Sequence, residues 1–167
     1  ISDSTAPILK SLSLTSTNVD LSNNDVTLTG TIRITDDYSG LQSGHLEWVS
    51  PSGDIYLYSS IHSSKLISGD SLDGIYQIDI DFKKGHENGT WKLNQIYIRD
   101  ETSNSVNHRG QIAVNNYGFN QEISVINSIS DSTAPILKSL SLTSTNVDLS
   151  NNDVTLTGTI RITDDYS

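Results

Sequence analysis

The chain has 167 residues, with 20 acidic against 10 basic side chains and a formal net charge of −10, and it contains neither cysteine nor methionine. Disulfides are therefore excluded, and the acidic balance argues against partners that need a basic face, namely nucleic acids and anionic membrane surfaces. No apolar run approaches the roughly 20 residues of a membrane helix, so we expect no membrane insertion in this segment.

Alternation of apolar and polar residues dominates the chain and predicts half-buried strands. The clearest case is 25–35, where Val, Leu, Gly and Ile on one side alternate with a Thr-rich side. In chain order the predicted strands cover 8–15, 19–21, 25–35, 45–49, 54–67, 74–83, 91–99 and 106–115. We find no helical periodicity, and about seven to nine strands in roughly 120 residues predict an all-β fold, a two-sheet antiparallel β-sandwich.

Particular residues sharpen this prediction. We expect Trp48 and Trp91 in the core, one from each sheet. The apolar side switches midway through the strand of Trp91, so we expect a bulge at 94–95 that restores the facing. Ile112 and Val114 alternate in the same way and mark the last predicted strand.

The first 39 residues recur without a change at 129–167, an offset of 128 throughout. Self-similarity at a fixed period is typical of a tandem array, and a unit of this size is large enough to be a domain. We therefore predict a complete repeat over 1–128 and the first two strands of the next identical repeat over 129–167. The chain would then be an excerpt from a longer protein.

Two strands alone cannot bury a core in water. One hypothesis is strand exchange, in which 1–39 or 129–167 completes a neighbouring identical repeat in the same or another chain. The other is that the partial copy only shows where the next unit of a longer chain begins.

The acidic residues cluster in three segments. In an immunoglobulin-like strand order, the N-terminal linker, the loop after 25–35 and the loop after 91–99 meet at one end of the sandwich. Converging carboxylates on flexible loops suit Ca²⁺, which takes six to eight oxygen ligands. The alternative is that these are ordinary turn residues on solvated loops. The candidate ligands are Asp36, Asp37 and Asp100, followed by Asp3, Glu101, Asn104 and Asp131 of the second copy.

A family resemblance rests on these motifs in this order: Asp-Ser-Thr-Ala-Pro at the start, then Thr-Asp-Asp-Tyr-Ser-Gly, Ser-Pro-Ser-Gly, Asn-Gly-Thr-Trp and Arg-Asp-Glu-Thr-Ser-Asn. The sequence resembles the bacterial immunoglobulin-like (cadherin- or fibronectin-like) tandem repeats of giant surface proteins and adhesins. It departs at 102–103, where Thr-Ser replaces a small-Gly pair. The resemblance implies an extracellular, cell-surface protein and a Ca²⁺-stiffened stalk or adhesin segment. Strand exchange between chains would instead make the repeat a filament-forming subunit.

We expect no enzymatic activity. The chain has no cysteine nucleophile, its four histidines lack zinc-ligand spacing, and no Gly-x-Ser-x-Gly elbow occurs. The alternative function is a carbohydrate- or surface-binding module, because Tyr56 and Tyr58 lie on the outward side of their strand and exposed rings stack on sugars. Cross-strand packing on the sheet surface is the explanation that we favour for the two tyrosines. Asn88-Gly89-Thr90 matches a glycosylation sequon, or a hairpin turn.

Overall fold

The computed structural model describes residues 2–128 and 133–164. The chain divides into two compact units, Ile1–Ser130 and Asp131–Ser167, close to the boundary that the repeat predicts. Among the described residues, no helix is long and apolar enough to cross a membrane. The fold is all-β, as expected, apart from two short helical segments.

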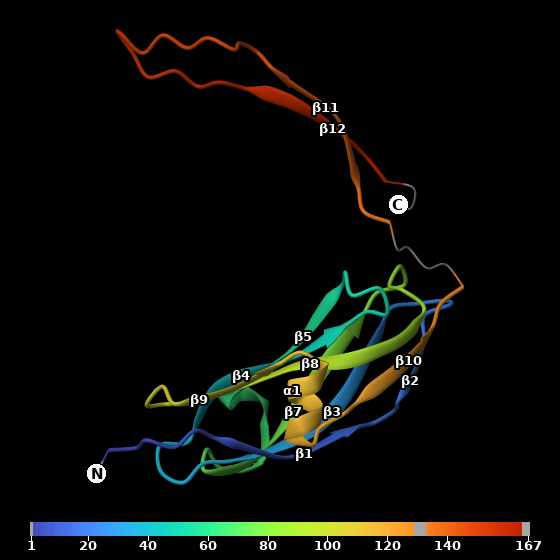
Figure 1. Ribbon diagram of the computed structural model, residues 1–167, viewed down its shortest axis with the longest axis vertical. Helices are drawn as coiled ribbons and strands as arrows, with labels where there is room; N and C mark the ends of the chain where they lie inside the picture. Colours follow the sequence, from blue (N-terminus) through green and yellow to red (C-terminus); the bar gives the residue numbers. More distant parts are fainter. Residues whose placement is uncertain (1, 129–132, 165–167) are drawn as a thin grey trace. The chain divides into compact units, whose positions relative to one another are not determined.

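One sheet of the first unit has four antiparallel strands in the order β1-β3-β7-β6 (Figure 1). Their bounds are β1 Ile8–Leu14, β3 Val26–Thr35, β7 Asp73–Phe82 and β6 Leu66–Gly69. β3 pairs with β7 along its whole length and with β1 only from Gly30 onward. The predicted alternation of β3 is confirmed, because Leu28, Ile32 and Ile34 are buried between more exposed neighbours.

The other sheet has six strands in the order β2-β10-β8-β4-β5, with β9 beside β8. Their bounds are β2 Asn18–Asp20, β10 Glu122–Ile126, β8 Gly89–Asp100, β4 Leu41–Val49, β5 Tyr56–His62 and β9 Ser105–Arg109. Every pair is antiparallel except β2 with β10, which run parallel with Val19 opposite Val125. A strand near the start of the unit is thus hydrogen-bonded to its last strand.

The core lies between the two sheets and contains both tryptophans, each fully buried. The expectation of one tryptophan per sheet is wrong: Trp48 in β4 and Trp91 in β8 belong to the same six-stranded sheet, because β4 and β8 pair directly. The four-stranded sheet contributes Tyr76 and Phe82 instead. The rings of Phe82 and Trp91 pack edge to face, with their centroids 5.4 Å apart.

The predicted bulge is confirmed. Glu47 lies opposite Gln95 and the next residue, Trp48, lies opposite Leu93, so Asn94 is the extra residue on β8. The bulge lets the apolar residues on both sides of it face the core.

The prediction of a last strand at 106–115 is wrong beyond Arg109. A short helix, α1 (Gln111–Tyr117), follows β9, and the strand that completes the sheet is β10. Ile112 and Val114 mimic strand alternation, yet only Val114 is buried and Ile112 is 78 % exposed. Gly118 ends the helix in the left-handed conformation at φ 93°.

The described part of the first unit has ten strands, more than the seven to nine predicted. The stretch 54–67, predicted as one strand, contains β5 and the start of β6. The 3₁₀ turn Ser63–Lys65 separates them and carries the chain from one sheet to the other.

The chain enters and leaves the first unit at opposite ends. At the first, which we call the Asp3 end, Ser39 N–H donates to Asp3 and the amide of Glu101 donates to the Gly40 carbonyl. At the second, the Asn127 end, the Asn127 side chain donates to the His86 carbonyl at 2.7 Å. β3 connects the two, and its ten residues span about 30 Å. Figure 1 shows the N-terminus and the end of β10 at these opposite ends.

The second unit is a hairpin of β11 (Ile136–Leu142) and β12 (Gly158–Thr163). Its register repeats that of β1 with β3 at an offset of 128, including the irregularity after Leu137 that matches the one after Leu9. β12 lacks the counterpart of the first four residues of β3, which in the first unit pair only with β7. The hairpin therefore keeps the pairs it can form alone.

Gly44 tests the close approach of β4 to β8. A Cβ at Gly44 would lie 2.4 Å from the backbone carbonyl oxygen of Tyr97, whereas a Cβ at Gly85 would meet nothing within 4 Å. We expect Gly44→Ala to lower the free energy of unfolding by about 1–3 kcal/mol, through overpacking that backbone cannot relieve, and Gly85→Ala to change it little. Urea unfolding of both variants checks this, and an unchanged midpoint for Gly44→Ala would contradict the register.

Candidate metal centre

Asp36 organises the loop between β3 and β4. Its Oδ1 accepts the backbone N–H groups of Tyr38, Ser39 and Gly40 at 3.1, 3.0 and 2.8 Å. Gly40 closes the loop at φ 85°, a left-handed conformation that favours glycine. With Oδ1 committed to the loop, the other oxygen, Oδ2, is buried and has no hydrogen-bond partner among the described residues.

Asp3 brings the N-terminal linker to this loop. Its Oδ2 accepts Ser39 N–H at 3.1 Å and its Oδ1 accepts Thr5 N–H at 3.0 Å. The hydrogen bonds with Ser39, followed by those with Thr5, lower the pKa of Asp3 below its ordinary value. The carboxylate is therefore held in its charged form.

Asp37 completes a triad with Asp3 and Asp36. One oxygen from each carboxylate lies within 4.8 Å of the other two. The Thr5 hydroxyl donates to Asp37 Oδ1, which ties the linker to the loop a second time. No Lys or Arg among the described residues forms an ion pair with any of the three. Three carboxylates, one of which has a buried oxygen without a partner, form a donor set that suits a hard cation such as Ca²⁺.

Three other candidate ligands lie close by but outside the triad. The Glu101 carboxylate accepts the Gln42 amide at 3.3 Å, and the Asn104 amide donates to Asp100. The loop after β8 contacts Ser39, a neighbour of the triad: the Thr102 hydroxyl oxygen lies 3.5 Å from the Ser39 hydroxyl oxygen.

Asp100 is fully buried and braces its own loop. Its Oδ1 accepts the N–H groups of Thr102 and Asn104, both at 2.8 Å, and its Oδ2 accepts the Asn104 side chain at 2.7 Å. Burial alone would raise the pKa of Asp100, but the hydrogen bonds from Asn104 and Thr102 outweigh it and the pKa is lowered. They also hold Ser103 at φ 80°, a left-handed conformation that favours glycine. Both oxygens are used, which speaks against a ligand role.

The seventh candidate, Asp131, lies outside the described residues. Asp164 is the residue of the second copy that corresponds to Asp36. It is among the described residues and directly follows β12.

Tyr56 and Tyr58 face outward, as predicted, at 43 and 55 % exposure. The Tyr58 hydroxyl donates to Glu47 at 2.8 Å, and its ring meets His45 edge-on at 5.6 Å. Sequence reasoning missed Glu47, which is fully buried and also accepts the Asn94 amide at 2.7 Å. The sequence carried no signal for its burial, because alternation with Leu46 and Trp48 places Glu47 on the outward side of the predicted strand.

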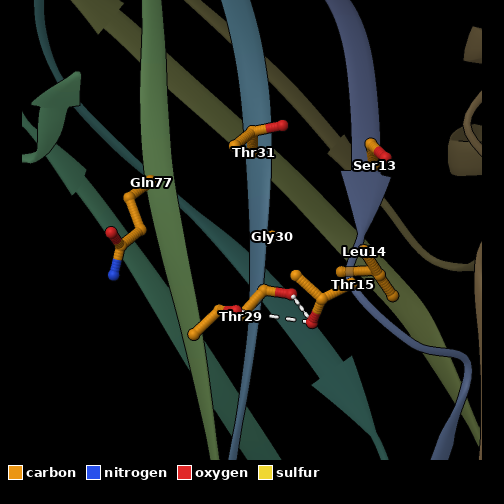
Figure 2. Close-up of a pocket in the computed structure, with 7 residues that line it drawn as sticks. All are labelled: Ser13, Leu14, Thr15, Thr29, Gly30, Thr31 and Gln77. Carbon is orange, nitrogen blue, oxygen red and sulfur yellow. Dashed lines mark hydrogen bonds between the residues drawn. The ribbon is translucent and has the colours of Figure 1, made fainter.

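A pocket on the four-stranded sheet is lined by residues from the neighbouring strands β1, β3 and β7 (Figure 2). The Thr15 hydroxyl donates to the Thr29 carbonyl at 2.8 Å. The polar groups that line this pocket are hydroxyls and one amide. No lining side chain is ionisable, so the pocket offers no general acid or base. It is lined by Ser13, Leu14, Thr15, Thr29, Gly30, Thr31 and Gln77.

Asp100→Ala tests the hydrogen bonds by which Asp100 holds the loop after β8. Removing a charged acceptor from buried donors should lower the free energy of unfolding by about 2–3 kcal/mol near neutral pH, while Asp54→Ala, at an exposed position, should change it little. Because the pKa of Asp100 is lowered in the folded state, its contribution is present above the ordinary value of 3.8 and is lost as the pH falls through the folded pKa. Urea unfolding from pH 7 to pH 3 checks this, and a difference that grows on acidification would contradict it.

Neither a curated protein nor a solved structure matches the chain. A family model, described as a domain of unknown function, matches residues 2–133, a range that spans the first unit and its junction with the second. Because this match covers well over half of the sequence, the chain belongs to the DUF7035 family.

Proposed function

We propose that residues 1–128 form an immunoglobulin-like β-sandwich that acts as a structural, load-bearing repeat of a tandem array in a large extracellular protein, with Ca²⁺ stiffening its Asp3 end. The observation that carries this proposal is the pairing of β2 with β10 in a unit that the chain enters and leaves at opposite ends. A unit with this arrangement can extend a chain.

Tension between the two ends loads this pairing along the strands. β1 and β2 run from the Asp3 end toward the Asn127 end, and β10 runs in the same direction. Pulling the ends apart would draw β2 backward and β10 forward, so their hydrogen bonds are sheared together. Two of these bonds are Ser124 N–H to the Thr17 carbonyl and Leu21 N–H to the Ile126 carbonyl, both at 2.8 Å.

Ca²⁺ fits the same role through Asp3, Asp36 and Asp37. When bound, the ion would neutralise the three carboxylates and give the orphaned Asp36 Oδ2 a partner. Asp3 lies in the linker that precedes β1, so the ion would fix the linker to the loop after β3 and stiffen the joint with whatever precedes the unit. Calcium sites of extracellular modules bind at about 10⁻⁴–10⁻³ M, so the proposed ion and the proposed extracellular location are compatible with each other.

A carbohydrate- or surface-binding module is the second candidate, and the exposure of Tyr56 and Tyr58 favours it. Tyr58, however, already bonds Glu47 and contacts His45, so cross-strand packing accounts for its position. We therefore place the structural role first.

Pulling direction tests the load-bearing role. Because the chain has no native cysteine, a Ser2→Cys, Ser128→Cys pair would attach handles at the two ends, and a Lys83→Cys, Ser128→Cys pair would attach both at the Asn127 end. We expect the first pair to unfold at higher force in single-molecule pulling, because it shears β2 from β10 whereas the second peels β10 from β8. Equal forces, or the reverse order, would refute the proposed role.

Calcium titration tests the ion. At about 5 mM Ca²⁺ we expect a stabilisation of about 1–2 kcal/mol, a rise of roughly 4–8 °C in Tm relative to excess chelator. Asp36→Asn should remove most of this rise, and Asp54→Asn, at an exposed site away from the triad, should retain it. The same Tm with calcium and with chelator would rule out the ion and leave the load-bearing role to the pulling experiment.

A further inference from the structure

One sequence motif has no role in the load-bearing unit. Asn88-Gly89-Thr90, where the loop 83–88 meets β8, matches the N-glycosylation sequon, in which any residue except proline separates Asn from Ser or Thr. It is the only triplet of this form in the sequence.

The structure removes the competing explanation of the motif, a two-residue Asn-Gly hairpin turn. Such a turn needs a positive φ at both of its residues. Gly89 has φ 128°, but Ser103 is the one non-glycine residue in the described part of the chain with a positive φ, so Asn88 does not fit. Gly89 is also already the first residue of β8, opposite Val125 of β10. The motif therefore does not form the hairpin turn.

The two side chains that define the sequon are both exposed. Asn88 is the last residue of its loop, and a Cβ added at Gly85 in the same loop would meet nothing within 4 Å. Thr90 lines an open pocket together with Pro51 and Gly53 of the turn after β4. A bulky, hydrated oligosaccharide thus has room on this part of the surface.

The loop is held in place on both sides of Asn88. The buried Trp91 donates from Nε1 to the Glu87 carbonyl at 2.9 Å, and Asn88 Oδ1 accepts Asn127 N–H at 3.3 Å. A sugar attached to an asparagine replaces a proton on Nδ2 and leaves Oδ1 as an acceptor. The contact with Asn127 is therefore compatible with modification.

We infer that Asn88 is an N-glycosylation site, which carries an oligosaccharide at the Asn127 end of the unit. The inference rests on the extracellular location in the proposed function, because the donor, an oligosaccharide linked to a lipid pyrophosphate, belongs to the secretory pathway. Asn88 Nδ2 forms a bond to the anomeric carbon of the sugar, the bond from that carbon to the pyrophosphate oxygen breaks, and the amide loses one proton. The lipid pyrophosphate leaves with the electron pair, so nothing is oxidised or reduced.

The test produces the full chain behind a cleavable secretory leader in a eukaryotic host. Thr90→Ser keeps the sequon, and Thr90→Val removes it while it retains a β-branched side chain at an exposed position of β8. Intact mass is measured on protein from the medium and from the cells, before and after an amidase removes N-linked glycans. The amidase reaction is run in heavy-oxygen water, so that the Asp it leaves at position 88 is distinguished from Asp formed earlier by spontaneous hydrolysis of Asn-Gly.

We expect the unchanged chain and Thr90→Ser to exceed 18.2 kDa by the mass of one oligosaccharide and to return to 18.2 kDa after the amidase, with heavy oxygen at position 88. Thr90→Val should have 18.2 kDa from the start. Because Asn88 is exposed, the Tm of the glycosylated chain should lie within about 3 °C of that of the amidase-treated chain.

Three results would overturn the inference. An unchanged chain of 18.2 kDa would mean that Asn88 is not modified. An oligosaccharide that Thr90→Val retains would lie elsewhere on the chain. A glycosylated chain that unfolds far below the amidase-treated chain would mean that the fold does not accommodate the sugar. Since the added leader supplies entry into the secretory pathway, each of these results counts against the glycan alone, whereas pulling and calcium titration test the proposed function on protein made without it.

Discussion

The first unit depends on the packing of residues 1–39 against the rest of it. β1 and β3 make up half of the four-stranded sheet, and β2 forms one edge of the other sheet, so this segment reaches both faces of the core. Leu21, Ile32 and Ile34 are completely buried there. Without these side chains the strands from β4 to β10 would expose their apolar faces, which is why one segment can control the stability of the whole unit.

The second unit isolates what that packing adds. It is built from the second copy of this segment, and it retains the β-hairpin pairing that needs no other partner. It lacks the counterpart of β2 and shortens that of β3, and its apolar side chains remain exposed. Local sequence therefore specifies register and turn, while the longer strands and the burial come from residues far along the chain.

Much of the fold follows from the sequence because alternation is a direct record of burial. The Thr-rich side of β3 and the switch of apolar parity around Asn94 were both sufficient to place strands and a bulge correctly. Helix α1 was missed because a helix of seven residues with one buried side chain, Val114, has no periodicity to detect. The flanking glycines Gly110 and Gly118 were the better signal. The placement of both tryptophans in one sheet depends on strand pairing, which single-strand patterns do not contain.

The sequence predicts where the candidate metal site lies better than it predicts which residues are its ligands. The strand order brought the linker and two loops to one end, and hydrogen bonds among Asp3, Ser39 and Thr102 join them there. Composition could not tell a carboxylate that braces its own turn from one with an oxygen to spare. Asp100 and Asp36 both accept backbone N–H groups, yet only Asp36 retains a buried oxygen without a partner. That distinction depends on the path of each loop.

The central claim is that residues 40–127 stabilise the repeated segment, and the two copies in one chain provide an internal control. Residue-resolved amide hydrogen exchange by NMR on the monomeric chain tests it most directly, because identical sequences have nearly identical intrinsic exchange rates. We predict strong protection at Ile32 and Ile34 and exchange close to the intrinsic rate at Ile160 and Ile162. Equal protection of the two copies in the monomer would contradict the account.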